Sequence, residues 1–311
     1  MQGKHILIAG CGKIGLRLAQ QLSIKHQVWG LKRKPPSEDS AITFLSADLL
    51  DKASLAQAFQ VKGIEGFDYV VYCLAPSERT AQAYRQVYVE GLHNLLTSLP
   101  NLKLTKRIYF ISSTSVYHQN DHSWVDESSA TFPEGFSGEI LLQAETLLKQ
   151  YPLLSTCVRF SGIYGGNRSR MIDQVRLSEI KVDVQSHITN RIHEDDCVGF
   201  LHYLIQRDVE GKSILPLYLG TDSKPVELNE VLRWISEQLN SENDLIQNGK
   251  TDSKMLISKE ISSKTSSPKR RSGNKYCSNK RLLETGYILK FPSYKEGYGA
   301  MINGLKFNAQ P

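Results

Sequence analysis

Apolar residues gather in short runs that alternate with amphipathic stretches through the first half of the chain. The apolar runs predict strands over 5–9, 27–31, 42–46, 67–74, 106–112 and 154–160. Helical periodicity fills the intervals and predicts helices over 13–24, 51–59, 79–98 and 137–150. Because these strands are continuously apolar, we expect both faces of their sheet to be covered. The order predicts an α/β fold with a doubly wound parallel sheet.

The regular alternation ends near residue 165. Beyond it, helices predicted over 170–179, 194–207, 226–240 and 294–304 mix with short strands such as 215–219. We therefore expect residues 1–165 to form the domain that contains the sheet. Residues 166–311 are expected to form a smaller, mixed α/β C-terminal lobe that binds substrate, with parts of 166–225 completing the sheet.

The first strand leads directly into a G-x-G-x-x-G turn, and a helical pattern follows. This strand–turn–helix context is typical of the Rossmann dinucleotide fingerprint, in which the helix N-terminus faces the pyrophosphate. Gly10 permits the tight turn, Gly12 lets backbone approach the phosphates, and Gly15 lets the helix pack closely on the strand. The alternative is a glycine-rich turn that binds another adenine-containing ligand. The expected cofactor contacts here are Gly10, Gly12, Lys13, Ile14 and Gly15.

The residues after the second strand bear on the choice of dinucleotide. An NAD-preferring site usually places Asp or Glu there, whereas this chain has Lys32, Arg33 and Lys34. A guanidinium at Arg33 could hold the 2′-phosphate of NADP(H). We therefore favour NADP(H), with NAD(H) possible. The alternative is that the three cations form a solvated loop tip.

Further cofactor contacts are expected at the carboxyl ends of the neighbouring strands, where ligands of open α/β sheets bind. Asp48 and Leu49 follow the third strand, and Asp48 could contact the adenine. Alternatively, Asp48 is the N-cap of the helix predicted over 51–59. Leu74 and Ala75 follow the fourth strand.

Composition narrows the class of protein. The chain has 311 residues and no apolar run long enough to cross a membrane, and its first residues already read as a core strand. Its five cysteines are scattered without a C-x-x-C pair. That distribution favours reduced thiols in a cytoplasmic protein and argues against a disulfide framework or a metal site.

The net charge of +6 is concentrated near the C-terminus, where residues 250–296 contain twelve Lys/Arg and four Asp/Glu. Residues 241–275 are also rich in Ser and Lys, so we expect a flexible basic segment there. Its cations either close over an anionic substrate or form a solvated loop. We do not expect a nucleic-acid partner, because the segment has no aromatic platform and no recognition helix.

Three further motifs occur in order along the chain: S-S-T-S-V-Y at 112–117, R-F-S-G-I-Y-G at 159–165 and N-R-I-H-E-D-D at 190–196. With the glycine-rich turn, they resemble the extended short-chain dehydrogenase/reductase superfamily, in its nucleoside-diphosphate-sugar epimerase/dehydratase group. The segments 274–283 and 291–298 resemble an atypical bacterial subgroup of it. The resemblance covers nearly the whole chain.

The resemblance implies a Tyr-x-x-x-Lys dyad, in which the lysine lowers the pKa of the tyrosine that moves the proton. Aligning residues 143–145 with the family helix puts Ser137 at the tyrosine position and Leu141 at the lysine position, so the dyad is expected to be absent. Ser113 matches the residue that orients the substrate hydroxyl. Tyr117 and His193 are secondary catalytic candidates. Asp195 is expected to cap the helix that follows it.

The resemblance implies an epimerase or oxidoreductase that acts on a sugar nucleotide or a similar small carbonyl or hydroxyl compound. The missing dyad favours an alternative of another class, a non-catalytic NADP(H)-binding sensor or assembly partner. Measured turnover of NADPH with a panel of carbonyl compounds distinguishes the two. The sequence is compatible with a homodimer and gives no sign of a membrane partner.

Overall fold

The computed structural model describes residues 3–36, 41–177, 187–246 and 274–307. Its centre is a seven-stranded sheet in the order β11-β7-β5-β4-β1-β2-β3, in which every neighbouring pair is parallel. The predicted doubly wound α/β sheet is confirmed. Its strands are β1 (His5–Ala9), β2 (Gln27–Lys32), β3 (Thr43–Ser46), β4 (Tyr69–Tyr72), β5 (Arg107–Ser113), β7 (Leu154–Phe160) and β11 (Leu217–Gly220).

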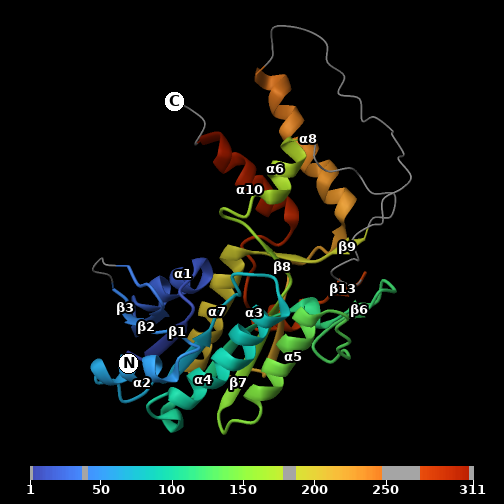
Figure 1. The fold of residues 1–311 in the computed structure, drawn as a ribbon. Helices are drawn as coiled ribbons and strands as arrows, with labels where there is room; N and C mark the ends of the chain where they lie inside the picture. Colours follow the sequence, from blue (N-terminus) through green and yellow to red (C-terminus); the bar gives the residue numbers. More distant parts are fainter. Residues whose placement is uncertain (1–2, 37–40, 178–186, 247–273, 308–311) are drawn as a thin grey trace.

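Helices cover both faces of this sheet (Figure 1). One face packs against α1 (Lys13–Leu22) and α7 (Glu194–Val209). The other packs against α2 (Lys52–Val61), α4 (Gly91–Ser98) and α5 (Phe136–Leu148). Burial on both sides explains why each strand reads as a continuous apolar run.

The first strand shows how this burial works. Successive side chains of a strand point to opposite faces. Leu7 and Ala9 accordingly join the cluster under α2, α4 and α5, whereas Ile6 and Ile8 join the cluster under α1 and α7. All four are completely buried.

The helix predicted over 79–98 is not a single α-helix. It consists of α3 (Ala81–Arg85), a π-helical turn (Gln86–Glu90) and α4. The Tyr72 hydroxyl on β4 donates a hydrogen bond to the Val87 carbonyl oxygen within the π-helical turn. A side chain inserted in this way accounts for the local change of helix type. Short 3-10 turns precede and follow β5, at Leu102–Leu104 and Thr114–Val116.

A smaller lobe lies at one end of the sheet (Figure 1). Its core joins Tyr164, Ile172, Val231, Ile235 and Tyr298. Its helices are α6 (Arg170–Arg176), α8 (Leu228–Ile246) and α10 (Tyr294–Phe307), and α9 (Lys280–Glu284) contacts β11. Three two-stranded pairs complete the structure: β8 (Gly162–Tyr164) with β10 (Arg191–His193), β9 (Ile188–Thr189) with β12 (Val226–Glu227), and β6 (Trp124–Val125) with β13 (Tyr276–Cys277).

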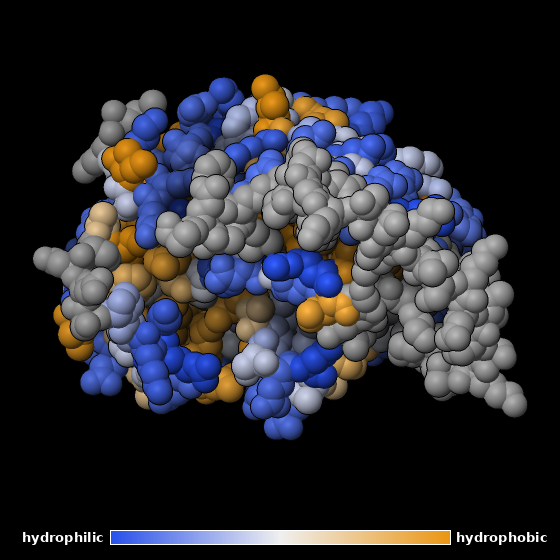
Figure 2. Space-filling view, turned by 90° about the horizontal axis from the view of Figure 1, so that it is seen from above, coloured by the Kyte–Doolittle hydropathy of each residue, from blue (hydrophilic) through white to orange (hydrophobic). Residues whose placement is uncertain are grey.

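The face seen from above is largely hydrophilic, with apolar residues gathered in a recessed area (Figure 2). Most of the basic segment expected at 241–275 lies outside the described residues. Among the helices of the described part of the chain, none is long and apolar enough to cross a membrane.

Candidate dinucleotide site

The glycine-rich turn between β1 and α1 has the geometry that its sequence predicts. Gly10 has a φ of +103°, and a Cβ there would lie 2.5 Å from the Cys73 carbonyl oxygen. A Cβ on Gly15 would overlap the Gly10 carbonyl oxygen, so the first turn of α1 packs directly on the loop. A Cβ on Gly12, in contrast, meets nothing within 4 Å. The backbone at Gly12 is therefore open to a ligand.

The N-terminal end of α1 suits a phosphate group. Gly12 is the N-cap, and neither a side-chain cap nor an acidic residue occupies the first turn. The first intrahelical hydrogen bond runs from the Leu16 N–H to the Gly12 carbonyl oxygen. Lys13, which is exposed, and Ile14, which is buried, thus carry N–H groups without partners inside the helix. These donors and the helix dipole favour an anion at this end.

The carboxyl end of β2 lies against this turn. The Gly10 N–H donates to the Leu31 carbonyl oxygen at 3.3 Å, which places Lys32 and Arg33 beside the fingerprint. Both side chains are exposed. No described acidic residue forms an ion pair with either of them. Their charges are therefore available to an anionic ligand.

The residues after β3 correct one expectation. Asp48 is not the N-cap of α2: that role belongs to Asp51, whose carboxylate accepts hydrogen bonds from the Ala53 and Ser54 N–H groups. Asp48 instead accepts from the Leu50 N–H within the loop. An aspartate three residues ahead of the true cap offers a similar local sequence signal.

Three more residues, Leu49, Leu74 and Ala75, are expected near the cofactor. Leu49 is half-buried against the core, and its carbonyl oxygen accepts from the Asn94 amide. Leu74 packs on the core beside Gly10, where a Cβ would lie 2.7 Å from the Leu74 Cγ. Ala75 follows it and is exposed. Leu74 and Ala75 therefore lie next to the glycine-rich turn.

Ser113 ends β5 and caps the 3-10 turn that follows. Its hydroxyl oxygen accepts a hydrogen bond from the Ser115 N–H at 3.1 Å. The hydroxyl proton is not used by that bond, so Ser113 can still donate to a ligand oxygen. The side chain is half-buried at the carboxyl edge of the sheet.

Tyr117 lies in a buried polar network. Its hydroxyl donates to the Asp126 carbonyl oxygen at 2.9 Å and accepts from Arg159 Nη1 at 2.5 Å. Arg159 also makes two hydrogen bonds to the Glu145 carboxylate, at 3.0 and 2.6 Å. Burial raises the pKa of Tyr117 to about 12, although the Arg159 charge opposes the rise. Tyr117 therefore keeps its proton near neutral pH.

The Glu145–Arg159 pair also fixes where α5 lies. It ties the helix to β7, and a Cβ on Gly138 would lie 2.5 Å from the Ser115 carbonyl oxygen. The first turn of α5 thus packs on the turn that carries Ser113. Ser137 is half-buried in that first turn, and Leu141 is buried in the core one turn later.

His193 ends β10 and is the N-cap of α7. Its Nδ1 accepts a hydrogen bond from the Asp195 N–H at 3.1 Å. The expectation that Asp195 caps this helix is therefore wrong, because an imidazole nitrogen takes that role. The ring is buried between Tyr164 and Phe291, and a Cβ on Gly165 would lie 2.5 Å from its Nε2. Burial lowers the pKa of His193 despite three nearby acidic residues.

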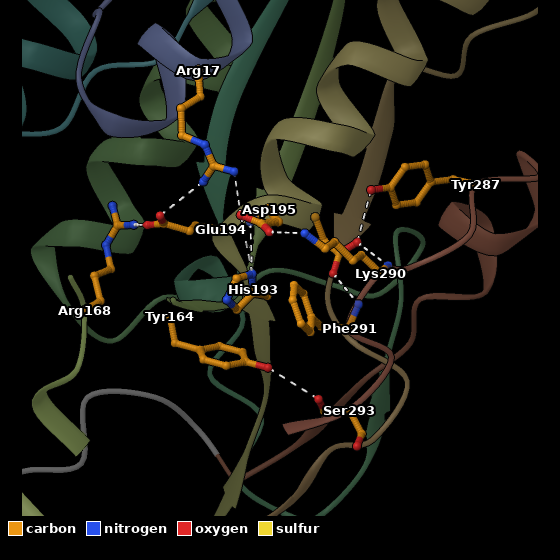
Figure 3. A network of polar contacts seen from close by, with 11 residues as sticks. Arg17, Tyr164, Arg168, His193, Glu194, Asp195, Tyr287, Lys290, Phe291 and Ser293 are labelled. Atoms are coloured by element: carbon orange, nitrogen blue, oxygen red, sulfur yellow. Dashed lines mark hydrogen bonds and ion pairs between the residues drawn. The ribbon is translucent and has the colours of Figure 1, made fainter. Parts of the chain in front are cut away.

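Asp195 instead belongs to a network of charged side chains between α1, α7 and the lobe (Figure 3). Its carboxylate pairs with Arg17 Nη2 at 2.5 Å and with Lys290 Nζ at 2.7 Å. The neighbouring Glu194 pairs with Arg17 and with Arg168, which precedes α6. These partners are distant in sequence, and no local pattern indicates them.

Lys275 is another residue that the sequence analysis missed. It is 1% exposed, and its Nζ donates to the Tyr117 carbonyl oxygen at 2.7 Å. Burial lowers its pKa. A lysine in a basic segment reads as a surface residue, so the sequence gives no signal for its burial.

Taken together, the parallel sheet, the open glycine-rich turn and the covering lobe define a doubly wound α/β protein of the dinucleotide-binding class. The chain belongs to the NAD dependent epimerase/dehydratase family, whose sequence model matches residues 6–214.

Individual relatives agree with this assignment. A structure from Methylobacillus flagellatus, named as a member of the same family, is 35% identical over 97% of this chain and 99% of its own, with a TM-score of 0.75. UDP-glucose 4-epimerase from Thermotoga maritima is 17% identical over 98% of this chain and 99% of its own, with a TM-score of 0.73. It shows the shared fold.

A curated relative matches a shorter region. UDP-glucose 4-epimerase from Mycoplasma genitalium is 29% identical over 139 residues. That match covers 40% of this chain and 39% of the relative, so the chain spans well under half of that relative's length.

Proposed function

We propose that this protein binds NADP(H) at the glycine-rich turn and presents it to a nucleotide-sugar-like or other small carbonyl or hydroxyl substrate. The observation that carries the proposal is the opening at Gly12, where a Cβ meets nothing within 4 Å. It lies at an uncapped helix N-terminus without acidic residues in its first turn. The residues present thus fit a pyrophosphate group. One solved relative of the same fold is described as a complex with UDP-glucose and NAD.

The preference for NADP(H) over NAD(H) rests on Arg33. Its side chain is exposed beside the fingerprint and has no described acidic partner, and Lys32 adds a second charge. A guanidinium suits the 2′-phosphate, which NAD(H) lacks. A carboxylate that would select the ribose hydroxyl is absent from residues 32–34.

The proposed cleft lacks the tyrosine and lysine of the superfamily. Ser137 stands in the first turn of α5, next to the turn of Ser113, and Leu141 is 3% exposed in the core. Bound NADP(H) supplies the hydride acceptor or donor. Ser113 orients the substrate oxygen through its free hydroxyl proton.

Neither Tyr117 nor His193 is well placed to move the proton between substrate and solvent. Tyr117 is held by Arg159 and Asp126, and burial raises its pKa to about 12. The Nδ1 of His193 caps α7, and its ring is enclosed by two aromatic side chains. These engagements favour slow chemistry. They also support the second candidate function, a non-catalytic NADP(H)-binding sensor or assembly partner.

Calorimetric titration with NADPH and NADH tests the proposal. We expect tighter binding of NADPH, and we expect Arg33→Ala to weaken NADPH by about 1.5–3 kcal/mol while leaving NADH nearly unchanged. Equal affinities of the wild-type protein for the two dinucleotides would refute the preference. Turnover of NADPH with a panel of carbonyl compounds then separates the two candidate functions: measurable turnover supports the enzyme, and binding without turnover supports the sensor.

A further inference from the structure

One buried carboxylate, that of Glu194, holds two arginines, one of which lies on the helix that follows the glycine-rich turn. Arg17 Nη1 lies 3.2 Å from Glu194 Oε1, and Arg168 Nη1 pairs with Glu194 Oε2 (Figure 3). The Glu194 side chain is 8% exposed, whereas both arginine side chains are 38% exposed. The two guanidiniums therefore both pair with this one carboxylate, and their side chains remain partly open to solvent.

The loop that carries Arg168 is tightly shaped around this carboxylate. Gly165 and Gly166 have φ values of +110° and +54°, and the Arg168 N–H donates to the Gly165 carbonyl oxygen at 3.0 Å. A Cβ on Gly166 would overlap Glu194 Oε1. The backbone of the loop thus packs directly against the carboxylate that the Arg168 side chain pairs with.

Arg168 is joined to α1 through Glu194, because Arg17 in the second turn of that helix pairs with the same carboxylate. Burial raises the pKa of the Cys73 thiol to about 12, and the nearby charge of Arg168 opposes this rise. A Cβ on Gly10 would lie 2.5 Å from the Cys73 carbonyl oxygen. The charge of Arg168 therefore acts on a residue whose backbone lies against Gly10.

We propose that Arg168 is a second phosphate-binding group of the dinucleotide site, which exchanges Glu194 for the pyrophosphate when a dinucleotide binds. The inference rests on the proposed dinucleotide site.

The exchange leaves no buried charge without a partner. Glu194 keeps Arg17 at 3.2 Å when Arg168 departs, and Arg17 also keeps Asp195 at 2.5 Å. Arg168 in turn moves from one anion to another. Because a guanidinium pairs with phosphate as well as with carboxylate through parallel N–H groups, Arg168 keeps a charge-assisted partner after the exchange.

The first test is calorimetric titration of NADPH and NADH against Arg168→Ala. We expect both dinucleotides to weaken by the same factor, about ten- to a hundredfold, because both contain the pyrophosphate. This common loss distinguishes Arg168 from Arg33, whose removal affects NADPH alone. Arg170→Ala is the matched control, since Arg170 is exposed at the start of α6, two residues further on. It should change neither affinity.

Glu194→Gln supplies a second, opposite readout. Removing the competing carboxylate charge should tighten both dinucleotides several-fold, and adding Arg168→Ala should abolish that gain. A residue of merely structural importance would not produce tighter binding. If wild-type protein binds dinucleotides and Arg168→Ala binds them within twofold of it, the role of Arg168 is refuted and the proposed function stands. If wild-type protein binds neither dinucleotide, the proposed function itself fails.

Discussion

Replacing Glu145 by glutamine should be among the most damaging single changes in the sheet domain. The carboxylate accepts two hydrogen bonds from Arg159 and one from the Ser112 hydroxyl at 2.7 Å, and both charged side chains are 7% exposed. The glutamine keeps the size of the side chain but removes the counter-charge of a buried guanidinium. Removing one partner of such a pair costs about 3–5 kcal/mol. Urea unfolding followed by circular dichroism measures this loss.

Glu284→Gln is the matched control for that experiment. Glu284 pairs with Lys280 at 3.8 Å, and the two side chains are 61% and 82% exposed. A pair this exposed is worth no more than about 0.5 kcal/mol. If Glu145→Gln shifts the urea midpoint as little as Glu284→Gln does, the buried pair does not hold α5 on β7, and our account of how α5 is positioned beside Ser113 is wrong.

Two further predictions concern the missing dyad on α5 and the buried carboxyl group of Asp222. Ser137→Tyr combined with Leu141→Lys should raise turnover of a carbonyl substrate by roughly 10²–10⁴-fold over wild type. Either change alone should do little. Equal turnover by the double variant and wild type would contradict the assignment of these two positions to the missing tyrosine and lysine. Burial raises the pKa of Asp222, the residue two positions after β11, to about 7. Between about pH 4 and pH 7 the folded protein therefore holds a proton that the unfolded chain has lost. The free energy of unfolding should accordingly fall as the pH rises through this range. Asp222→Asn should remove this loss of stability, which is about 1.4 kcal/mol for each unit by which the pKa is raised. If the unfolding temperatures of variant and wild type differ by the same amount at every pH, Asp222 is not the source of the pH dependence.

The central sheet could be predicted from the sequence because its strands are covered on both faces. In β1, Ile6 and Ile8 point to one layer of helices and Leu7 and Ala9 to the other, so the strand reads as an unbroken apolar run. The glycine-rich turn was equally clear, since each glycine has its own steric requirement. Gly10 needs a positive φ, and Gly15 needs close packing.

Helix caps were not predictable at the level of single residues. Asp48 and Asp51 both precede α2, and only the path of the loop makes Asp51 the cap. At α7, the N-cap is His193, whereas Asp195 lies inside the first turn and pairs with Arg17 and Lys290. Those two partners lie far from Asp195 in the sequence, so the outcome depends on the tertiary fold.

The charged contacts between α1 and α7 could not be predicted for the same reason. Arg17 and Glu194 are 177 residues apart, and their pairing requires α1 and α7 to share a face of the sheet. The strands of the short pairs outside the central sheet, such as β6 and β13, contain only two or three residues each. Such segments are too short to show a period.

The most direct test of the account is calorimetric titration of NADPH against wild-type protein and Gly12→Val. A side chain at Gly12 meets no protein atom within 4 Å at its Cβ, so the variant should keep its stability within about 1 kcal/mol. The branched side chain would nevertheless fill the space that the pyrophosphate needs. We predict saturable binding of NADPH to wild type and none to the variant. A folded Gly12→Val protein that binds NADPH as tightly as wild type would contradict the assignment of the dinucleotide site.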